Sequence, residues 1–328
     1  MKMVKDSYTN SELLELFEQY LEHEALSGFP NVLLEPAQHI LYMRGKRIRP
    51  VMTLTACQAF GGELSEALGP ASAVEIFHNF SLVHDDIIDV ADKRRGKPTV
   101  HKLFGLNKAI LAGDAMLLHA FMQLNKGPKE KSGELLNVFN KAASQVIEGE
   151  QIDVDFEDIP EVSEDDYMLM IKLKTSVLLA ASLQLGAIIG GASHVDQKHI
   201  YDFGLNLGLA FQIKDDYLDS YGDAEKFGKK IGGDIVQNKK TYLLIAALKN
   251  SDESERQEIF KLFKEKKETI KIEKMLAVFD RLSVKNQTFA RMEILYDKSL
   301  ESLKQLSISE PMRQPLYALA EMVYQRNH

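Results

Sequence analysis

The chain of 328 residues is 45% hydrophobic and 27% charged, as in an ordinary globular protein. Its net charge of −8 argues against a nucleic-acid partner, because a phosphate backbone is bound by a basic face. The single cysteine, Cys57, excludes an intramolecular disulfide and a zinc site built on cysteines. Residues 1–7 lack the apolar core of a signal peptide, and we expect a cytoplasmic protein.

Apolar residues recur at helical spacing along most of the chain, and the alternation typical of strands is almost absent. Ser11 is expected to cap a first helix, Pro50 to open a second that stops at Gly61, and Pro70 to open a third. Further helices are expected over residues 108–124, 133–155, 164–190, 196–221, 240–248, 253–263, 270–296 and 315–324. Residues 94–101 and 226–240, rich in Gly, Pro or Lys, are expected to be loops.

No linker or shift in composition divides the chain, so the sequence predicts an all-α fold in a single domain over residues 1–328. Residues 175–193 carry no charge and are long enough to suggest a membrane span. They include serines, glycines and Gln184, and lysines flank them at only one end. We therefore expect a buried core helix there and no stable membrane insertion.

Two copies of one acidic pattern stand 130 residues apart, Asp85–Asp89 (DDIID) and Asp215–Asp219 (DDYLD). In each copy the outer aspartates are four residues apart and project from one face of a helix. Carboxylates at this spacing repel each other, and unpaired charge is costly in the apolar sequence around them. A hard divalent cation explains the pattern, because Mg²⁺ takes one or two carboxylates together with the oxygens of a phosphate-bearing substrate. One copy alone would be a solvated acidic turn, but two copies in apolar contexts favour a metal site.

Short basic clusters lie close to the acidic motifs along the chain. They comprise Arg44–Arg49, Lys93–Lys97, Lys172–Lys174, Lys229–Lys230 and Lys239–Lys240. Arginine binds phosphate through a planar fork of donors, and lysine acts as a mobile point charge. A single cluster would be a solvated surface, but clusters after both acidic motifs predict a site for a diphosphate and its metal. A P-loop is not supported, because Lys174 and Lys240 lack the upstream glycines of that motif.

With these motifs the chain resembles the trans-isoprenyl diphosphate synthase family, also called polyprenyl synthetases. The matching segments are Gly45–Pro50, Leu82–Asp89, Arg94–His101, Gly113–Asp114, Lys174–Thr175, Phe211–Asp219 and residues 228–239. The resemblance implies an all-α helical bundle around a deep central cavity, usually as a homodimer. It also implies an Mg²⁺-dependent condensation of isopentenyl diphosphate with an allylic diphosphate to a short-chain all-trans prenyl diphosphate.

The resemblance gives each matched residue a role. Mg²⁺ bridging the allylic diphosphate would be bound by Asp85, Asp89 and Asp215, with Asp86, Asp216 and Asp219 binding directly or through metal-bound water. The allylic substrate would be held by Arg94, Lys174, Gln212, Lys229 and Lys239, and isopentenyl diphosphate by Lys46, Arg49, His78 and Arg95. Thr175 and Gln212 would offer oxygen dipoles to a carbocation. Arg47 fits least well, since the family pattern stresses Lys46 and Arg49.

Product length is expected to depend on residues just before the first motif. In the family, an aromatic residue five positions before the first aspartate accompanies short products, and here that residue is Phe80, followed by the small Ser81. This combination resembles geranylgeranyl diphosphate synthases, with farnesyl diphosphate as the second choice. Helix geometry places Ser81 nearer the carboxylate face than Phe80, so Phe77 or Val74 is an alternative floor for the growing chain.

Two other classes of protein share part of this pattern. A cyclising terpene synthase uses the same aspartates with magnesium, but it needs no isopentenyl site, so Lys46, Arg49, His78 and Arg95 argue against it. A regulatory subunit that has lost catalysis would have eroded aspartate motifs, and both motifs are complete here.

Overall fold

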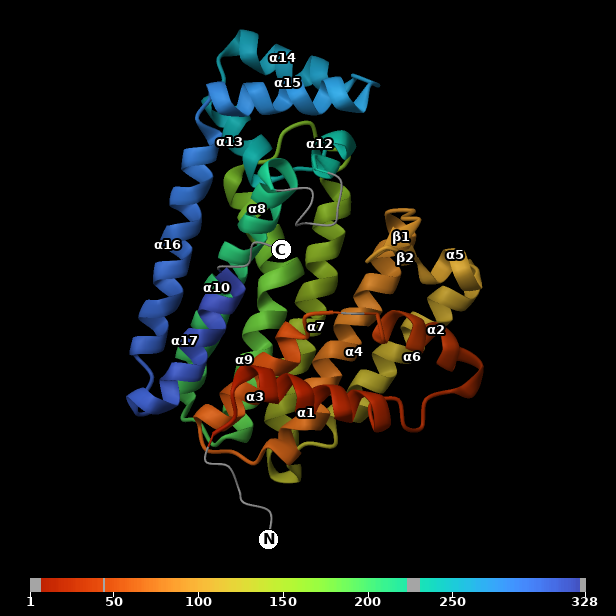
Figure 1. Ribbon diagram of the computed structural model, residues 1–328, viewed down its shortest axis with the longest axis vertical. Coiled ribbons are helices and arrows are strands. Elements are labelled where there is room, and N and C mark those ends of the chain that lie inside the picture. Colours follow the sequence, from red (N-terminus) through yellow and green to blue (C-terminus); the bar gives the residue numbers. More distant parts are fainter. Residues whose placement is uncertain (1–6, 44, 223–230, 325–328) are drawn as a thin grey trace. The chain divides into compact units, whose positions relative to one another are not determined.

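A computed structural model describes residues 7–43, 45–222 and 231–324 (Figure 1). Helices make up 78% of the described residues, which contain only one two-stranded antiparallel hairpin. The predicted all-α class is therefore confirmed. Helices dominate because apolar residues recur every three to four positions and bury one side of most segments.

The chain divides into two compact units, which are described separately. Unit 1 comprises residues 1–143, 181–201 and 306–319, and unit 2 comprises residues 144–180, 202–305 and 320–328. Unit 1 contains α1 (Asn10–His23), α2 (Asn31–Leu41), α3 (Ile48–Ala59), α4 (Leu64–Ile88), β1 (Lys93–Arg94), β2 (Lys97–Pro98), α5 (Val100–Phe104), α6 (Leu106–Leu124) and the short η1 (Lys129–Lys131). Unit 2 contains α8 (Glu164–Ile171), η2 (Lys172–Ser176), α12 (Gly233–Gln237), α13 (Tyr242–Asn250), α14 (Glu253–Phe263), α15 (Glu268–Arg281) and α16 (Val284–Lys304). The remaining helices belong partly to each unit: α7 (Ser132–Asp155), α9 (Val177–Ile189), α10 (His194–Tyr221) and α17 (Glu310–Tyr324). The single domain stays a prediction.

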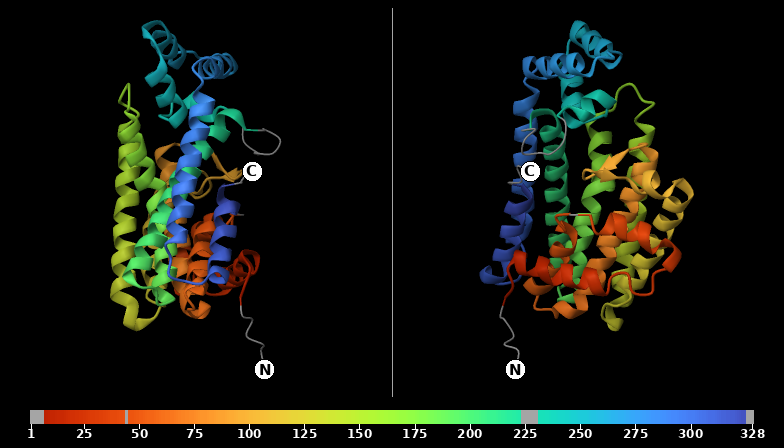
Figure 2. Two further views of the ribbon diagram at one scale, coloured as in Figure 1. Left: turned by 90° about the vertical axis from the view of Figure 1, so that its left-hand side faces the viewer. Right: turned by 45° about the vertical axis from the view of Figure 1, so that its right-hand side comes forward.

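In unit 1, α4 is the central helix and packs against both α3 and α6, while α1 packs against α3 and α2 against α6. Most of α4 is buried, including the apolar Val74, Ile76 and Phe77. The β1–β2 hairpin follows the C-terminal end of α4 and pairs Arg94 with Lys97 (Figures 1 and 2). Burial of α4 thus fixes the helix whose last turn carries the first aspartate motif.

In unit 2, the apolar core lies among α8, α10, α13, α15 and α16 and includes Tyr167, Ile213, Leu243 and Phe279. α13 packs against α8, α15 and α16, and α14 lies against α15 (Figure 1). The second aspartate motif lies in the last turns of α10, next to Ile213 of this core.

Several helix ends differ from the sequence-based expectation. The first helix is capped by Thr9, whose side chain accepts from the N–H of Glu12 in a capping box, and Ser11 lies inside the helix. α4 begins at Leu64, so Pro70 lies in its second turn instead of opening it. Pro70 has no N–H to donate to the carbonyl of Glu66, so α4 lacks one backbone hydrogen bond at this turn.

The predicted loops and one predicted helix also need correction. Residues 94–101 include part of the β1–β2 hairpin, and residues 226–240 include α12. The helix expected over 270–296 is two helices, α15 and α16, because Ser283 adopts a left-handed conformation (φ 55°) between them. α2 was not predicted, since it follows Pro30 and spans only Asn31–Leu41.

The uncharged stretch forms α9 and is buried almost throughout. The continuous helical segment Glu164–Ile189 is long and apolar enough to cross a membrane, but 67% of its apolar window is buried inside the protein. This burial is typical of a core helix, as the sequence predicted.

Candidate functional site

The first aspartate motif lies at the C-terminal end of α4, in unit 1. Asp85 is half-buried in the last turn, and Asp89, the residue that ends the helix, is exposed. One turn of helix separates the two, so both carboxylates lie on one side of the helix end. Asp86, between them, is only 1% exposed. Adjacent aspartates therefore have different environments, and Asp85 and Asp89 form the accessible pair.

Arg94 reaches Asp86 because the β1–β2 hairpin turns the chain back toward the end of α4. Arg94 Nε donates to Asp86 Oδ1 at 2.9 Å. Burial raises the pKa of Asp86, and the nearby Arg94 opposes part of that rise. Among the described residues, Asp86 Oδ2 and both ring nitrogens of the neighbouring His101 have no hydrogen-bond partner. The structure therefore brings Asp86 and Arg94 together, and Asp86 positions the hairpin.

Three of the four residues expected to hold isopentenyl diphosphate, Arg49, His78 and Arg95, are brought together in unit 1. Burial, followed by the charges of Arg49 and Arg95, lowers the pKa of His78 well below its ordinary value. His78 is therefore a neutral imidazole beside two guanidinium groups at neutral pH. Lys46 lies in the exposed turn before α3, and Arg49 is half-buried in the first turn of that helix. A neutral histidine, together with charged lysine and arginine side chains, offers hydrogen-bond donors to a diphosphate.

The expected chain-length residues form an aromatic group one to two turns before Asp85. Phe80 is 6% exposed, and its ring meets His84 edge-on at 4.9 Å and Phe77 at 5.4 Å between centroids. Phe77 is fully buried and meets Phe139 of α7. Ser81 is half-buried and donates its hydroxyl to the carbonyl of His78.

The second aspartate motif lies near the end of α10, in unit 2, and its middle member is structural. Asp216 accepts hydrogen bonds from the Tyr167 hydroxyl (2.6 Å), the Tyr242 N–H (2.9 Å) and Gln212 Nε2 (3.3 Å). Burial raises the pKa of Asp216 to about 7, with a further contribution from Asp234. Asp216 therefore joins α8, α10 and α13, as Asp86 joins α4 to the hairpin in unit 1.

Asp219 connects the second motif to α12. Its Oδ2 accepts from the N–H of Asp234 at 2.9 Å, and its carbonyl accepts from the N–H of Gly232 at 2.7 Å. The first residues of α12 are thereby held against the end of α10. Asp215 is half-buried one turn away from Asp219. Asp215 and Asp219 repeat the spacing of Asp85 and Asp89 in the other unit.

Lys174 belongs to an ion-pair group that sequence reasoning missed. Its Nζ lies 2.6 Å from Asp153 and 2.8 Å from Glu150, both on α7. Thr175 Oγ1 donates to Gln212 Oε1 at 3.0 Å, so the expected Lys174, Thr175 and Gln212 lie close together. The acidic partners could have been found from their spacing, since Glu150 and Asp153 are three residues apart and share a helix face.

A π-helical segment, η2, carries Lys174 and Thr175. Such segments inside α-helices often occur at functional sites, because the wider turn displaces side chains. A Cβ on Gly149 of α7 would lie 2.2 Å from the backbone nitrogen of Lys174, and one on Gly208 of α10 would lie 2.8 Å from Cα of Ser176. Glycines on both neighbouring helices therefore allow the close approach that this segment requires.

Of the last two predicted basic residues, Lys239 lies among the described residues. Lys239 is half-buried just after α12, and its N–H donates to the carbonyl of Asp234 at 3.0 Å. Lys229 lies outside the described residues.

The donor groups fit a hard cation that arrives with its substrate. Within the described ranges, no group of three or more Asp, Glu, His or Cys side chains is arranged to hold a metal by itself. The accessible pair on α4 supplies carboxylate oxygens only, which Mg²⁺ prefers over nitrogen or sulfur. One or two carboxylates suffice when phosphate oxygens and water complete the coordination.

Comparison with known proteins gives the family. The polyprenyl synthetase family profile matches residues 30–279. A short chain isoprenyl diphosphate synthase of Methanothermobacter thermautotrophicus is 35% identical, covering 97% of this chain and 99% of the relative. A solved geranylgeranyl pyrophosphate synthase superposes with a TM-score of 0.93 at 41% identity, covering 98% of this chain and 99% of that chain. A Caulobacter crescentus polyprenyl synthase complexed with calcium and isoprenyl diphosphate gives 0.87 at 26% identity, covering 97% of each chain. The names of further relatives include geranylgeranyl and geranylfarnesyl diphosphate synthases.

The fold is thus the all-α isoprenoid synthase fold, and the protein is an enzyme, a trans-prenyltransferase. The chain belongs to the polyprenyl synthetase family of trans-isoprenyl diphosphate synthases. This family acts on isopentenyl diphosphate and allylic diphosphates, and it uses a divalent metal ion.

Proposed function

We propose that this protein is an Mg²⁺-dependent prenyltransferase that condenses isopentenyl diphosphate with an allylic diphosphate. The product is a short-chain all-trans prenyl diphosphate, with geranylgeranyl favoured over farnesyl. The observation that carries the proposal is the pair of accessible carboxylates at the end of α4, Asp85 and Asp89, on the same helix as His78, which lies about two turns before Asp85 and close to Arg49 and Arg95. Acidic and basic groups on successive turns of one helix suit two diphosphates, one bound with a metal and one bound by cations.

Asp85, Asp89 and, from the resemblance, Asp215 would hold Mg²⁺ on the allylic diphosphate. When bound, the metal supplies positive charge that stabilises the departing diphosphate. The resemblance assigns Arg94, Lys174 and Lys239 as further donors to this anion and Gln212 and Thr175 as oxygen dipoles. Asp86 and Asp216 keep Arg94 and Gln212 in place through the hydrogen bonds described above.

The reaction begins when the allylic C–O bond breaks and leaves a carbocation. The double bond of isopentenyl diphosphate attacks this carbon, and a proton is then lost to the departed diphosphate. No protein side chain has to be a strong base. Water must be excluded, and the apolar residues of α4 around Phe77 and Phe80 supply a dry surface.

The second diphosphate, that of isopentenyl diphosphate, would be bound by Lys46, Arg49, His78 and Arg95. A neutral His78 would donate one hydrogen bond to the diphosphate, and it would add no positive charge beside a bound metal ion. The arginines would supply the positive charge. A cyclising terpene synthase does not need this group.

Phe80 and Phe77 are proposed to close the end of the product cavity. Their buried, edge-to-face packing makes a rigid floor, since each ring is held by another aromatic ring. The names of relatives include synthases of geranylgeranyl and of geranylfarnesyl diphosphate, so the comparison does not fix one product length. The length has to be measured by experiment.

A homodimer is proposed for the active enzyme, in the cytoplasm and without stable membrane insertion. It is supported by an exposed apolar surface on unit 1, the α6 surface, made of Leu111, Leu118 and Met122. These residues are seven and four positions apart and therefore share one face of α6, and an exposed apolar face is typical of an interaction surface.

Incorporation of radiolabelled isopentenyl diphosphate tests the activity. Label should enter an acid-labile prenyl product only when both Mg²⁺ and an allylic primer are present, and chelation by EDTA should stop it. Dimethylallyl, geranyl and farnesyl diphosphate are supplied in turn as primers. A product formed without isopentenyl diphosphate would indicate cyclisation instead, and no product with any primer would indicate a regulatory subunit.

A further inference from the structure

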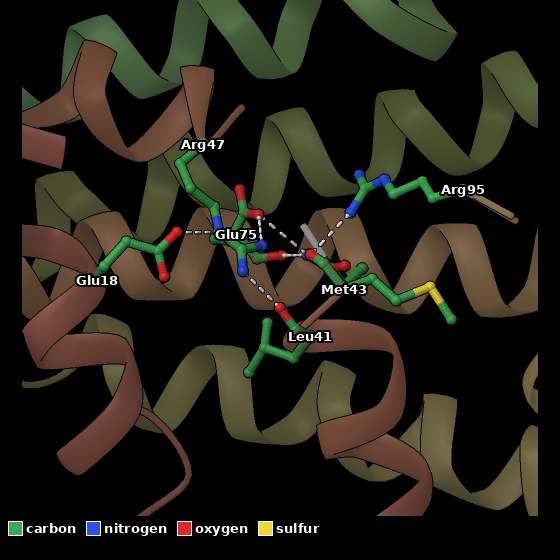
Figure 3. Close-up of polar contacts among 7 residues, drawn as sticks. Glu18, Leu41, Met43, Arg47, Glu75 and Arg95 are labelled. Carbon is green, nitrogen blue, oxygen red and sulfur yellow. Dashed lines mark hydrogen bonds and ion pairs between the residues drawn. The ribbon is translucent and has the colours of Figure 1, made fainter. Parts of the chain in front are cut away.

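A buried ion network lies directly beneath the basic turn that precedes α3. Its centre is Arg47, which is 4% exposed although it stands among basic residues. Arg47 Nη1 donates to Glu75 at 2.7 Å, Nε to Glu18 at 2.9 Å and Nη2 to the carbonyl of Leu41 at 2.7 Å (Figure 3). One guanidinium group therefore links α1, the end of α2 and the middle of α4 to the start of α3.

These contacts exclude Arg47 as a ligand of the substrate. Each of its three guanidinium nitrogens donates to an acceptor of the protein, and its side chain is 2% exposed. Its two carboxylate partners, Glu18 and Glu75, outweigh its single charge, so the network as a whole does not attract an anion. A role for Arg47 in binding must act through other residues.

The turn that Arg47 holds is conformationally costly. Arg47 has φ 46° and ψ 37°, in the left-handed region, where a residue other than glycine costs roughly 1–2 kcal/mol. The three hydrogen bonds of its side chain offset this cost and fix the turn. The backbone on either side is thereby directed so that Lys46 is exposed and Arg49 starts the helix half-buried.

Arg95 depends on the same turn from the other side. Its Nη1 donates to the carbonyl of Met43 at 3.4 Å (Figure 3). A Cβ on Gly45 would lie 2.9 Å from the same nitrogen, so the guanidinium lies against the backbone of the turn. Movement of the turn would displace Arg95 as well as Lys46.

Glu75 carries the connection into α4. It is 3% exposed and lies three residues, about one turn, before His78. Asn79 Nδ2 donates to Glu75 Oε1 at 3.2 Å and to its carbonyl at 2.8 Å. The carboxylate of Glu75 is therefore shared between Arg47 and the turn of α4 that carries His78.

We propose that Arg47 and Glu75 are positioning residues for the isopentenyl diphosphate site. Through one buried ion pair they hold Lys46, Arg49 and Arg95 in register with His78, and neither touches the substrate. This inference rests on the proposed function, because it assigns those four residues to one diphosphate. Within this basic motif it distinguishes Lys46 and Arg49, which bind, from Arg47, which holds them in place.

The test is a pair of folded variants compared with two controls. Arg47→Met alone would leave Glu75 buried without its cation, which is destabilising, so Arg47→Met is combined with Glu75→Gln. This double variant removes both charges at similar volume. Arg47→Lys is the second variant, because it keeps a buried positive charge but not the three-way fork. Glu18→Gln removes only the charge of the half-exposed partner and keeps an oxygen that can accept from Arg47, and Arg313→Gln removes an arginine from a surface pair with Glu310.

Steady-state kinetics would be measured separately for each substrate. Melting temperatures would be measured for the same variants and controls. In the double variant and in Arg47→Lys we expect the KM for isopentenyl diphosphate to rise by about tenfold or more, because small displacements of binding groups are costly. The KM for the allylic diphosphate should stay within about twofold, as should both constants in the two controls. A folded double variant with an unchanged KM for isopentenyl diphosphate would overturn the inference, as would an equal rise for both substrates.

Direct titration keeps this inference separate from the proposed activity. Calorimetry with isopentenyl diphosphate measures its Kd without turnover, and the same rise is expected in the variants. A wild-type protein that binds isopentenyl diphosphate but forms no prenyl product would contradict the proposed function and leave this comparison valid. A wild-type protein that does not bind it would overturn the inference.

Discussion

Asp85 and Asp86 are neighbours in the chain, yet they have different tasks. Asp86 is buried and accepts a hydrogen bond from Arg94, whereas Asp85 lies half-buried one turn from Asp89. The same division separates the buried Asp216 from Asp215 and Asp219. In each motif the second aspartate faces the packed side of the helix, about 100° from its predecessor. The first motif therefore supplies one anchor and two accessible oxygen ligands, and in the second motif Asp219 also holds the start of α12.

Asp85→Ala is expected to reduce turnover by about a hundredfold or more, because a charge-stabilising group is lost from the metal site. The fold should stay intact or become slightly more stable, since one of several repelling carboxylates is removed. Radiolabel incorporation and the melting temperature without metal check the two effects. The matched control is Asp92→Ala, a nearby aspartate whose side chain is 80% exposed, which should keep its activity. A large fall in melting temperature without metal would mean that Asp85 is structural.

Phe80→Ala is expected to lengthen the product, because it removes a ring that packs against Phe77 and His84 at the proposed floor. It should also cost about 3–5 kcal/mol of stability, the usual effect of truncating a buried aromatic ring. Thin-layer chromatography of the dephosphorylated products gives the length. The comparison variant is Phe121→Ala, which truncates a ring of α6 that meets Phe139. An unchanged product distribution would move the floor to Phe77 or to another helix.

At the scale of elements, the helices that carry site residues are held by close backbone contacts and buried hydrogen bonds. η2 lies against Gly149 and Gly208, and the start of α10 is fixed by Asp196. Apolar periodicity predicts such helices, but their local geometry depends on one or two residues each.

Gly149→Ala should damage the site through packing. The added Cβ would meet the backbone of Lys174 and Leu173, so the π-helical segment must shift, at a cost of about 1–3 kcal/mol. We expect the KM for the allylic diphosphate to rise, because Lys174 and Thr175 move with that backbone. Gly133→Ala, also on α7, is the control: nothing lies within 4 Å of its Cβ, so both stability and KM should be kept. Equal kinetics in the two variants would contradict the role of the close approach.

Asp196 links the first turn of α10 to the segment before α17. Its carboxylate accepts from the hydroxyls of Ser193 (2.8 Å) and Ser307 (2.5 Å) and from the N–H of Ser307 (2.8 Å). Burial alone would raise the pKa of Asp196, but these hydrogen bonds outweigh it and the pKa is lowered. The ionised carboxylate therefore stabilises the folded state.

Asp196→Ala is expected to lower the free energy of unfolding by about 1–3 kcal/mol, because the serines lose a charged acceptor. The folded pKa lies below the ordinary value of 3.8, so the contribution is full above that value and disappears as the pH falls through the folded pKa. Urea unfolding at pH 7 and at pH 3 should thus show a larger difference between variant and wild type at pH 7. An equal difference at both pH values would contradict the charged role.

At the scale of the whole molecule, an exposed apolar surface predicts that two copies of the chain associate. The α6 surface exposes Leu118 at 68% and Leu111 at 56%. Leu118→Glu places a charge where we expect apolar residues to be buried between two copies, so a dimer should dissociate at micromolar concentration. Light scattering gives the mass. Val32→Glu, at an equally exposed valine on α2, should not change it. A monomeric wild-type protein would refute the homodimer.

The sequence by itself determined the all-α class, the family resemblance and most of the candidate site. Helical periodicity repeats along the chain, and the aspartate and basic motifs are contiguous segments. The periodicity and the motifs can therefore be recognised in the sequence without knowledge of tertiary contacts. The separate tasks of Asp85 and Asp86, the pairing of Lys174 with Glu150 and Asp153, and the structural role of Arg47 were decided only by the tertiary structure. Burial and hydrogen-bond partners depend on segments distant in sequence. The identity of a charged residue therefore does not show whether its side chain faces a substrate or a buried carboxylate.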